Sequence, residues 1–572
     1  MKLTRFLAIL FLLILNKGLS HAQSYLNLDF ETIREGLPYL WVFPHSHGRA
    51  TIDSIEKVNG RYSLRMTSNN AGPGTPSIFN TEFIIDTGIV GDIRLRGKVK
   101  TQPSDTGRAE LFLIGFNQNK ILGEGVEQNR VDVGTSGWQE LEVVLKLDSP
   151  AIRIALGGFC KGQATAWFDD LELFINGKKH DIPALRSDPL TAREVEVLKN
   201  YCYPLKSYEP TFADQDDLHI LKELWGKAKI LGLGEESHGT SEVYKMKHRL
   251  AKYLAENNIF NRLSFEVNMP EAYQFNQLIQ KDQIDGVDIS EQLHFWIYET
   301  HEFQDIIKWI ASISKDKSAV EFSGFDMQYI DGSIKELNDK LKDHEKAISA
   351  IQKLEKILTS IQDNYHQTGK LTITPVQTDS SSILVQEIRD CIGKDVKDAT
   401  QKGWLLQCLR VIEQYLDDSL LYRDKYMAEN LAWLLQQNKN HKIIASGHNG
   451  HITKTGKRMG YYLSQQYKED YIAIGATFHE GSYRAGDVYD AETSFPGTYE
   501  YLLNSIDMPI FVLDLKRIKN ERPSELEWLL QPGLSRSIGG QKRQFEFMRL
   551  NLSESYDYLI FIKQVSPTQM LR

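Results

Sequence analysis

The 572-residue sequence predicts a multidomain protein, with an N-terminal all-β jelly-roll sandwich followed by a C-terminal α/β domain that has a mostly parallel sheet and an inserted helical subdomain. Three observations predict this architecture. The chain is longer than the roughly 250–300 residues at which single hydrophobic cores stop growing. Its first third carries short alternating runs typical of strands. Its remainder carries continuous apolar runs that alternate with helical patterns.

The first 22 residues predict a secretory signal peptide. Lys2 and Arg5 form a short positive region before the apolar run Phe6–Leu15, and Ser20-His21-Ala22 supplies small residues for a cleavage site before Gln23. The apolar run is too short to span a bilayer as a permanent helix, and no later stretch is long and apolar enough. We therefore expect an exported protein, periplasmic or extracellular, with no stable membrane span.

Residues 23–178 predict the β-sandwich, because short runs rich in β-branched and aromatic residues recur between Gly, Asp and Asn. Its most distinctive motifs are Asn27-Leu28-Asp29-Phe30-Glu31, Gly137-Trp138-Gln139 and Ala166-Trp167-Phe168-Asp169-Asp170-Leu171. This segment resembles carbohydrate-binding modules of jelly-roll fold, which implies a glycan as one candidate partner. Trp41, Trp138 and Trp167 are either stacking platforms for sugar or ordinary core aromatics.

Residues 179–198 are polar, contain two prolines and predict a linker. Residues 199–572 predict the α/β domain, because its continuous apolar runs are typical of strands covered on both faces. These runs are Lys229–Leu233, Arg262–Val267, Val320–Asp326, Lys442–Ser446, Tyr471–Phe478, Pro509–Leu515 and Tyr558–Ile562. Residues 333–440 are almost wholly helical in pattern, which predicts an inserted subdomain that caps the pocket.

Composition excludes some classes of partner. The chain is 41% hydrophobic and 25% charged, as is ordinary for a globular protein, and its formal net charge is −9 with both signs interspersed. No basic run is long enough to follow a phosphate backbone, so we expect no nucleic-acid partner. Four cysteines are too few for a disulfide scaffold. Cys391 and Cys408 lie on consecutive predicted helices and either pair or remain free buried thiols.

Titratable residues stand at three strands of the predicted sheet, where packing residues would be expected. Glu235 and His238 follow one apolar strand, and their spacing of three places them on one side of a helical first turn. Glu266 interrupts a second strand, and His448 and His451 follow a third. Ligand sites in open α/β sheets form where strands end, so we expect these five side chains to share one site.

Each motif also has a structural explanation. A Gly-Glu loop before a helix could be a simple cap, and a loop histidine is usually on the surface. Glu266 could form a structural salt bridge with Arg249 or Lys247, since a buried carboxylate needs a partner. The occurrence of all three motifs on one sheet favours a reaction centre, because perturbed carboxylates and histidines cluster at such places.

The order and spacing of these motifs resemble the erythromycin esterase family, from about Asp217 to the C-terminus. Further matching pieces are Phe322-Ser323-Gly324-Phe325-Asp326, Arg423-Asp424, Met427-Ala428-Glu429-Asn430 and Gly475-Ala476-Thr477-Phe478. The resemblance covers about two-thirds of the chain and leaves out the signal peptide and the sandwich. It implies a hydrolase that opens macrolactone rings by adding water, an activity that confers antibiotic resistance.

The resemblance also implies roles for the site residues. His238 would be the general base, and Glu235 and Glu266 would orient it or hold the water. His448 and His451 would steady the developing oxyanion or protonate the leaving alcohol. The resemblance further implies four supporting or substrate-binding positions, which are Lys247, Glu236, Asn449 and Asp326. Of these, Lys247 would pair with the glutamates.

The sequence bears on two features of the expected chemistry, the nucleophile and the need for a metal. It has no Gly-x-Ser-x-Gly elbow, and Ser237 stands in a different context, so direct attack by water is favoured over an acyl-enzyme. We expect no required cofactor. A divalent metal is the alternative, because two carboxylates and three imidazoles would satisfy Zn²⁺. In that case the ligands would come from Glu235, His238, Glu266, His448 and His451.

The leading hypothesis is therefore a carboxylic ester hydrolase with a small-molecule ester or lactone as substrate. An export signal and a carbohydrate-binding-module-like domain are unusual for an enzyme that inactivates a drug. A second hypothesis is therefore an exported esterase, or a related enzyme, that acts on polysaccharide. A third is a carbohydrate-binding protein that uses the same pocket without turnover.

Overall fold

The structure is a computed structural model that describes residues 26–44, 50–69, 76–102, 107–117, 120–125, 130–132, 137–180, 185–284, 286–313, 320–368, 371–417 and 419–571. The expected signal peptide at 1–22 lies outside the described residues. The chain forms two compact units. One comprises the chain up to Arg186 together with two C-terminal segments, 531–535 and 547–550, and the other comprises the remainder.

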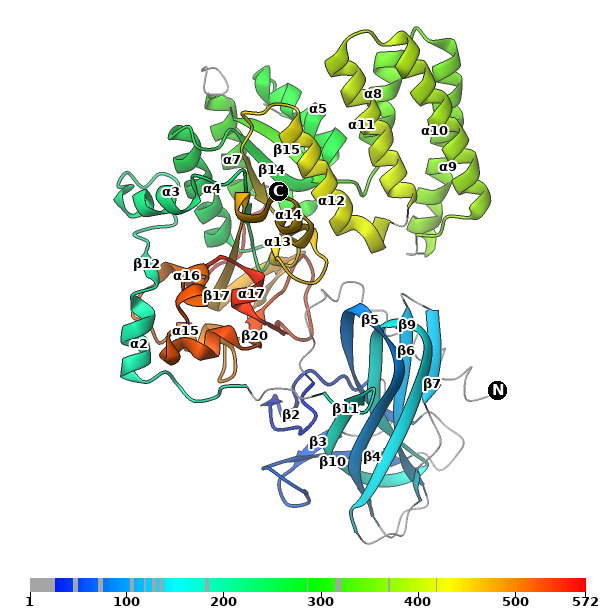
Figure 1. The fold of residues 1–572 in the computed structure, drawn as a ribbon, viewed down its shortest axis with the longest axis vertical. Coiled ribbons are helices and arrows are strands. Elements are labelled where there is room, and N and C mark those ends of the chain that lie inside the picture. The colour runs from blue at the N-terminus through cyan, green and yellow to red at the C-terminus, as the bar shows by residue number, and fades with distance from the viewer. Residues whose placement is uncertain are drawn as a thin grey trace. The chain divides into compact units, whose positions relative to one another are not determined.

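The N-terminal unit is built on long antiparallel strands, as its alternating sequence predicts (Figure 1). Their spatial order is β3-β4-β10-β5-β9-β6-β7. The bounds are β1 Ile33–Arg34, β2 Leu37–Pro38, β3 Ala50–Asp53, β4 Ser63–Asn69, β5 Ser77–Thr101, β6 Arg108–Asn117, β7 Lys120–Gly125, β8 Arg130–Asp132, β9 Gln139–Lys161, β10 Gln163–Ile175 and β11 Lys178–Lys179. Strands β5 and β9 are 25 and 23 residues long, so runs that the sequence presents as separate short strands are continuous.

The tryptophans of this unit mostly serve its core. The ring of Trp41 is fully buried and lies 5.2 Å from the ring of Phe79. Trp167 is buried as well, and its indole N–H donates to Asp53 Oδ2 at 2.9 Å. Trp138 keeps partial exposure. Two of the three candidate stacking platforms are therefore packing residues.

The C-terminal unit contains a mixed sheet in the order β12-β19-β22-β17-β13-β16-β14-β15. Neighbours from β22 through to β15 run parallel, whereas β12 and β19 pair antiparallel at one edge. The strands of this unit are β12 Cys202–Pro204, β13 Ile230–Leu233, β14 Arg262–Asn268, β15 Glu321–Asp326, β16 Ile443–Ser446, β17 Tyr471–Ala485, β18 Asp487–Asp490, β19 Ile510–Asp514 and β22 Tyr558–Val565. Strands β20 Gly533–Arg536 and β21 Phe547–Leu550 form a separate two-stranded sheet, most of which groups with the N-terminal unit. Every strand that the apolar runs predict is present. Strands β12, β18, β20 and β21 are three or four residues long and were not expected. Strand β12 ends in a proline, as suits its position at the edge of the sheet.

Helices cover the sheet, and their sequences explain their positions. Helix α4 (Ser241–Glu256) buries the stripe Val243, Met246, Leu250 and Leu254, whose spacing of three and four places them on one face. The other helices near the sheet are α3 His219–Trp225, α5 Met269–Gln280, α6 Ile289–Leu293, α7 His301–Ile313, α13 Asn449–Ile452, α14 Met459–Tyr467, α15 Tyr499–Leu503, α16 Leu515–Glu521 and α17 Leu552–Ser555. Helix α2 (Ala192–Lys199) begins with a capping box at Thr191, so the second half of the predicted linker is a helix.

The predicted helical insert at 333–440 contains two kinds of helix. Helices α8 to α11 pack side by side as a bundle that stands apart from the sheet in Figure 1. Helix α12 instead returns to pack against β15 and α14. The bounds are α8 Asp331–Leu341, α9 Glu345–Thr368, α10 Pro375–Asp395, α11 Ala399–Leu416 and α12 Ser419–Gln436. The return of α12 matters because it brings Arg423 and Asp424 to the edge of the sheet.

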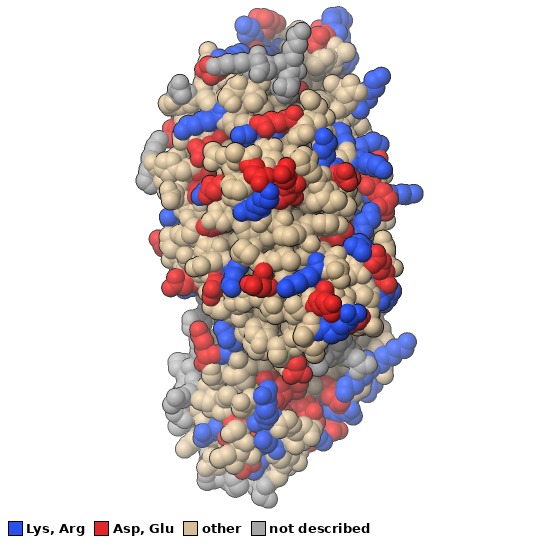
Figure 2. Space-filling view, turned by 90° about the vertical axis from the view of Figure 1, so that its left-hand side faces the viewer, with Lys and Arg blue, Asp and Glu red and all other residues tan. Residues whose placement is uncertain are grey.

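Three further expectations concern cysteine pairing, membrane-spanning helices and basic surface areas. Cys391 and Cys408 are both buried and free, so they do not pair. Among the described residues, no helix is long and apolar enough to cross a membrane. The face in Figure 2 shows basic and acidic side chains interspersed, without a broad basic area.

Candidate functional site

Three neighbouring strands bring the predicted site residues together. Strands β13, β16 and β14 are adjacent and parallel, so their carboxyl ends share one edge of the sheet. Glu235 follows β13, His448 follows β16, and Glu266 lies near the end of β14. The imidazole rings of His238 and His448 lie with their centroids 5.4 Å apart, and His448 and His451 with theirs 6.3 Å apart.

Glu235 orients His238. The carboxylate Oε1 of Glu235 lies 2.5 Å from His238 Nδ1, and its Oε2 accepts from the ammonium of Lys247. Burial alone would raise the pKa of Glu235, but Lys247 and His238 outweigh it and lower the pKa to about 2. The ionised carboxylate can only accept, so Nδ1 of His238 donates to it, and Nε2 is the ring nitrogen left for other partners. The contact forms in a loop, not in a helical turn as expected, because α4 begins only at Ser241.

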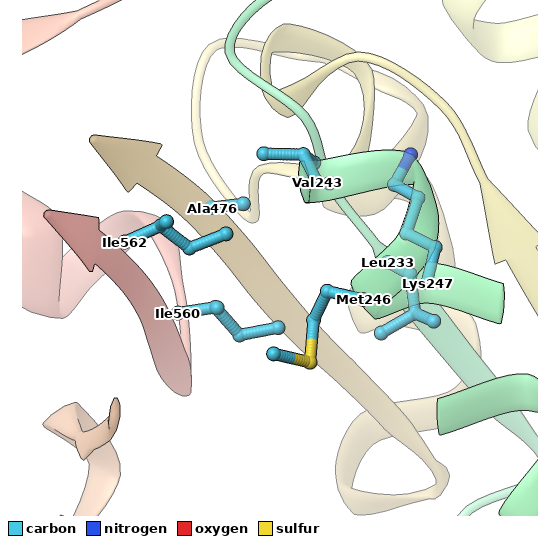
Figure 3. A pocket seen from close by; sticks show the side chains of 8 residues that line it. Leu233, Val243, Met246, Lys247, Ala476, Ile560 and Ile562 are labelled. Atoms are coloured by element: carbon cyan, nitrogen blue, oxygen red, sulfur yellow. The ribbon is translucent and has the colours of Figure 1, made fainter. Parts of the chain in front are cut away.

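Lys247 reaches this carboxylate from α4. Its ammonium also donates to Ser446 Oγ at 3.0 Å, at the end of β16. Figure 3 shows its stem beside an apolar recess between α4 and the sheet, lined by Val243, Met246 and Ile560 among others. The recess has no room for a water molecule, so it is packing beneath the site and not a substrate pocket.

Glu266 is held by an arginine from α12. Arg423 Nη2 donates to Glu266 Oε1 at 2.7 Å and to Asp326 Oδ2 at 2.7 Å. The other Glu266 oxygen accepts from the backbone N–H of His448 at 3.1 Å. Burial alone would raise the pKa of Glu266, but His451 and Arg423 hold it well below its usual value. Glu266 is thus a fixed anion, and its partner is neither Arg249 nor Lys247.

His451 lies between two carboxylates. Its Nδ1 is 2.8 Å from Asp424 Oδ1, and its Nε2 is 3.3 Å from Glu266 Oε1. Arg458 donates to the second oxygen of Asp424 at 2.8 Å. Burial alone would lower the pKa of His451, but Glu266 and Asp424 outweigh it and raise the pKa to about 9. His451 is therefore an imidazolium at neutral pH.

His448 is neutral and held by the backbone. Its Nδ1 accepts from the N–H of Gly450 at 3.1 Å, which makes His448 the N-cap of α13. Its Nε2 lies 3.3 Å from the carbonyl oxygen of Glu236, so Nε2 carries the proton. Burial, and then the neighbouring imidazoles of His238 and His451, lower the pKa of His448 to about 3. Both ring nitrogens of His448 are therefore engaged by the backbone.

Glu236 and Asn449 are interior residues. The carboxyl group of Glu236 is 0% exposed and contacts Thr240 Oγ1 at 3.1 Å, and burial raises its pKa to about 8. The amide of Asn449 bonds both the N–H and the carbonyl oxygen of Ala476, and so ties α13 to β17. Of the two expected roles, substrate binding or support, these buried positions favour support.

In the sequence, Arg423 and Asp424 are only part of the family resemblance and carry no predicted role. Arg458 and the segment Ile538–Arg543 were not predicted to belong to the site. Gly539 and Gly540 in that segment face His448 and His238, respectively. The available signal was an Arg-Asp pair in a helical stretch and a Gly-Gly pair near the C-terminus, and neither pattern is specific.

The carboxylate oxygens of Glu235 and Glu266, which a metal ion would need as ligands, already have hydrogen-bond partners. Lys247 and His238 take both oxygens of Glu235, while Arg423 and the His448 N–H take those of Glu266. Among the residues that the structure describes, no group of three or more His, Cys, Asp and Glu side chains has an arrangement that could hold a metal ion. His238 and His451 each keep 14% of their side-chain surface exposed, so both are open to a small ligand.

Comparison with known proteins agrees with the resemblance of the motifs. A family model described as erythromycin esterase matches residues 255–565. The putative hydrolase YbfO of Bacillus subtilis (strain 168) is 23% identical over 416 residues, which are 63% of this chain and 89% of that protein. Erythromycin esterase type II of Escherichia coli is 24% identical over 327 residues, which are 50% of this chain and 77% of that protein.

A solved structure shares the fold of the C-terminal unit. It is described as a succinoglycan biosynthesis protein, is 24% identical, and has a TM-score of 0.57. The alignment covers 66% of this chain and 98% of that chain. Because the family model spans more than half of the sequence, the chain belongs to the erythromycin esterase family.

Proposed function

We propose that this protein hydrolyses an ester or lactone by water that His238 activates, without an acyl-enzyme. Family membership supports hydrolase activity. The observation that carries the mechanism is the pairing of His238 Nδ1 with the ionised Glu235 on a partly exposed ring, because in the neutral tautomer that this pairing favours Nε2 is the proton acceptor. A histidine oriented in this way by a carboxylate is suited to general-base catalysis.

The proposed reaction balances with the groups present. His238 Nε2 takes one proton from water, and the water oxygen bonds to the acyl carbon. The tetrahedral intermediate collapses as the bond to the alkoxy oxygen breaks, and His451 gives its proton to that oxygen. The proton on His238 returns through solvent to His451. The products are one carboxylic acid and one alcohol, or one hydroxy acid from a lactone.

The remaining residues have supporting roles in this proposal. His448 holds Glu266 through its backbone N–H and keeps its own Nε2–H on the carbonyl oxygen of Glu236, so it positions the site. Arg423 and Asp424 hold Glu266 and His451 in place. The proposed steps use no metal, and this part of the proposal is supported by the engagement of the glutamate oxygens with cations and a backbone N–H.

The test of the base is His238→Ala in the full chain. Hydrolysis is expected to disappear while the circular dichroism spectrum is unchanged. His219→Ala is the matched control, since His219 belongs to the same unit and its side chain is 67% exposed. Retained turnover in His238→Ala would exclude His238 as the base.

The metal-free reaction is tested by chelation. Full activity after chelation, with elemental analysis finding no transition metal, would support it. Activity that returns only with added metal would contradict it.

The substrate is proposed to be a macrolide-type lactone or a related small ester. The alternative, an exported esterase on polysaccharide, is favoured by the similarity to a protein described as a succinoglycan biosynthesis protein and by the expected signal peptide. A panel of macrolides and acylated glycans separates the two. Ring-opened macrolide supports the first, deacylated glycan supports the second, and glycan binding without product supports a carbohydrate-binding protein.

A further inference from the structure

The segment Ile538–Arg543 forms one wall of the site. The N–H groups of Ile538 and Gly539 donate to the carbonyl oxygen of Glu236 at 2.7 and 2.9 Å, and the N–H of His238 donates to the carbonyl oxygen of Gly539 at 3.2 Å. A Cβ added at Gly540 would lie 3.1 Å from His238 Cδ2. The segment is thus fixed against the loop that carries the proposed base.

Gly539 lines a small space between the side chains of Arg543 and His448. It has a φ of +77°, which favours glycine. A Cβ placed there would lie 3.8 Å from Arg543 Nη2 and 3.8 Å from His448 Nε2, with nothing else within 4 Å beyond its neighbours in the chain. The guanidinium of Arg543 and the imidazole edge of His448 therefore flank the same small volume.

Arg543 is a cation without a counter-charge. Its Nε donates to the carbonyl oxygen of Ile538 at 2.7 Å, which fixes the guanidinium, and no carboxylate of the described chain pairs with it. The other cations of the site are all paired, Lys247 with Glu235 and Arg423 with Glu266. Arg543 is half-buried, and a cation removed from water is costly unless an anion accompanies it.

We propose that Arg543 binds an oxyanion group of the substrate, a carboxylate or a phosphate, beside the ester that His238 hydrolyses. This inference rests on the proposed function and adds the class of its substrate, an ester that carries an acidic group. A guanidinium matches the geometry of two oxygens on one such group. A substrate whose substituent at this position is a cation is disfavoured by the same charge.

The test compares three 4-nitrophenyl esters of equal acyl length: the hexanoate, the adipate half-ester and the 6-aminohexanoate. Wild type is expected to have a kcat/KM for the adipate about 10- to 100-fold above that for the hexanoate, with the aminohexanoate lowest. Arg543→Gln should bring the acidic-to-neutral ratio close to one, and Arg543→Glu should invert the order. Lys542→Gln is the matched control, because the neighbouring Lys542 packs over the ring of Tyr489 and should leave the ratio unchanged.

A binding measurement separates this inference from the proposed function. Saturation-transfer NMR with adipate and with the uncharged adipamide needs no turnover. Selective binding of adipate by wild type and Lys542→Gln, lost in Arg543→Gln, supports the inference even if no ester is cleaved. Equal cleavage of all three esters by wild type would overturn it while leaving the hydrolase intact. An equal loss of kcat for all three esters in Arg543→Gln would also overturn it, since the arginine would then serve the reaction and not a substrate anion.

Discussion

Glu235 and Glu236 are adjacent in the sequence but have opposite electrostatic surroundings. Lys247 and His238 lower the pKa of Glu235 to about 2, after outweighing its burial, whereas burial raises the pKa of Glu236 to about 8. At pH 7 the first is an anion and the second a neutral acid. A glutamine has nearly the shape of the neutral acid, so the two positions should respond differently to the same substitution.

Glu235→Gln is expected to reduce kcat by about 10²- to 10⁴-fold at pH 7, because the amide cannot accept the Nδ1 proton of His238 as a carboxylate does. It also leaves the buried Lys247 without its counter-charge, so a lower melting temperature should accompany the loss. Steady-state kinetics and thermal unfolding measure both effects.

Glu236→Gln serves as the control at the next position, and should keep both the fold and kcat at pH 7. If the two variants lost activity equally, the ionised state of Glu235 would not be what the reaction uses.

His451 predicts an alkaline limit of activity. Glu266 and Asp424 raise its pKa to about 9 against the opposing effect of burial, so the proton that it gives to the leaving oxygen is present below pH 9 and lost above it. We expect kcat to fall as the pH rises through about 9. The same shift stabilises the fold, fully below the unfolded pKa of about 6.5, and this stabilisation is lost as the pH rises through about 9.

Asp424→Asn removes one of the two charges that raise the pKa of His451. The alkaline limb of the kcat profile should therefore move to lower pH. A profile whose limb stays in place would mean that another group sets it. Measuring kcat between pH 6 and about 10.5 decides between these outcomes.

At the scale of elements, the sequence predicts strands better than loops. The runs before Glu235 and His448 are apolar throughout because parallel strands are covered on both faces, and that pattern has few alternative explanations. Parallel strands also align their carboxyl ends, so the meeting of Glu235, Glu266 and His448 follows from the pattern. Arg423 could not be assigned, because its charge in a helical stretch looks like that of any solvated face until α12 packs on β15.

Gly540 tests the segment that faces the proposed base. A Cβ there would come within 3.1 Å of His238 Cδ2, so Gly540→Ala must displace the imidazole by a few tenths of an ångström. Small displacements at a reaction centre are expensive, and we expect kcat/KM to fall by about 10- to 100-fold with the fold intact.

Gly403→Ala is the matched control for Gly540→Ala. Gly403 lies inside α11, where an added Cβ meets nothing within 4 Å. This variant should keep full activity and gain up to ~1 kcal/mol of stability from helix propensity. Unchanged kinetics in Gly540→Ala would show that the segment does not constrain His238.

At the scale of the whole molecule, the sequence predicts two parts but not how the chain is shared between them. Residues 531–535 and 547–550 group with the N-terminal unit, although more than 300 residues separate them from it in sequence. The N–H of Phe547 donates to the hydroxyl of Tyr39 at 3.1 Å within that unit. Four-residue strands such as β20 and β21 carry too little periodicity to reveal such a partner in advance.

This sharing predicts that the N-terminal unit influences catalysis through the chain itself. Strands β20 and β21 hold both ends of the segment 536–546, which includes Gly540 and Arg543. Phe547→Ala removes a fully buried ring from the N-terminal unit and should cost ~3–5 kcal/mol there, while also loosening one attachment of the segment. We expect kcat/KM at 25 °C to fall together with the unfolding temperature of that unit.

Phe168→Ala is the control for Phe547→Ala, because Phe168 is equally buried in the same unit but far in sequence from the segment. Calorimetry should find similar destabilisation in both variants. If kcat/KM also changed equally in both, the effect would come from the stability of the unit and not from the strands that flank the segment 536–546.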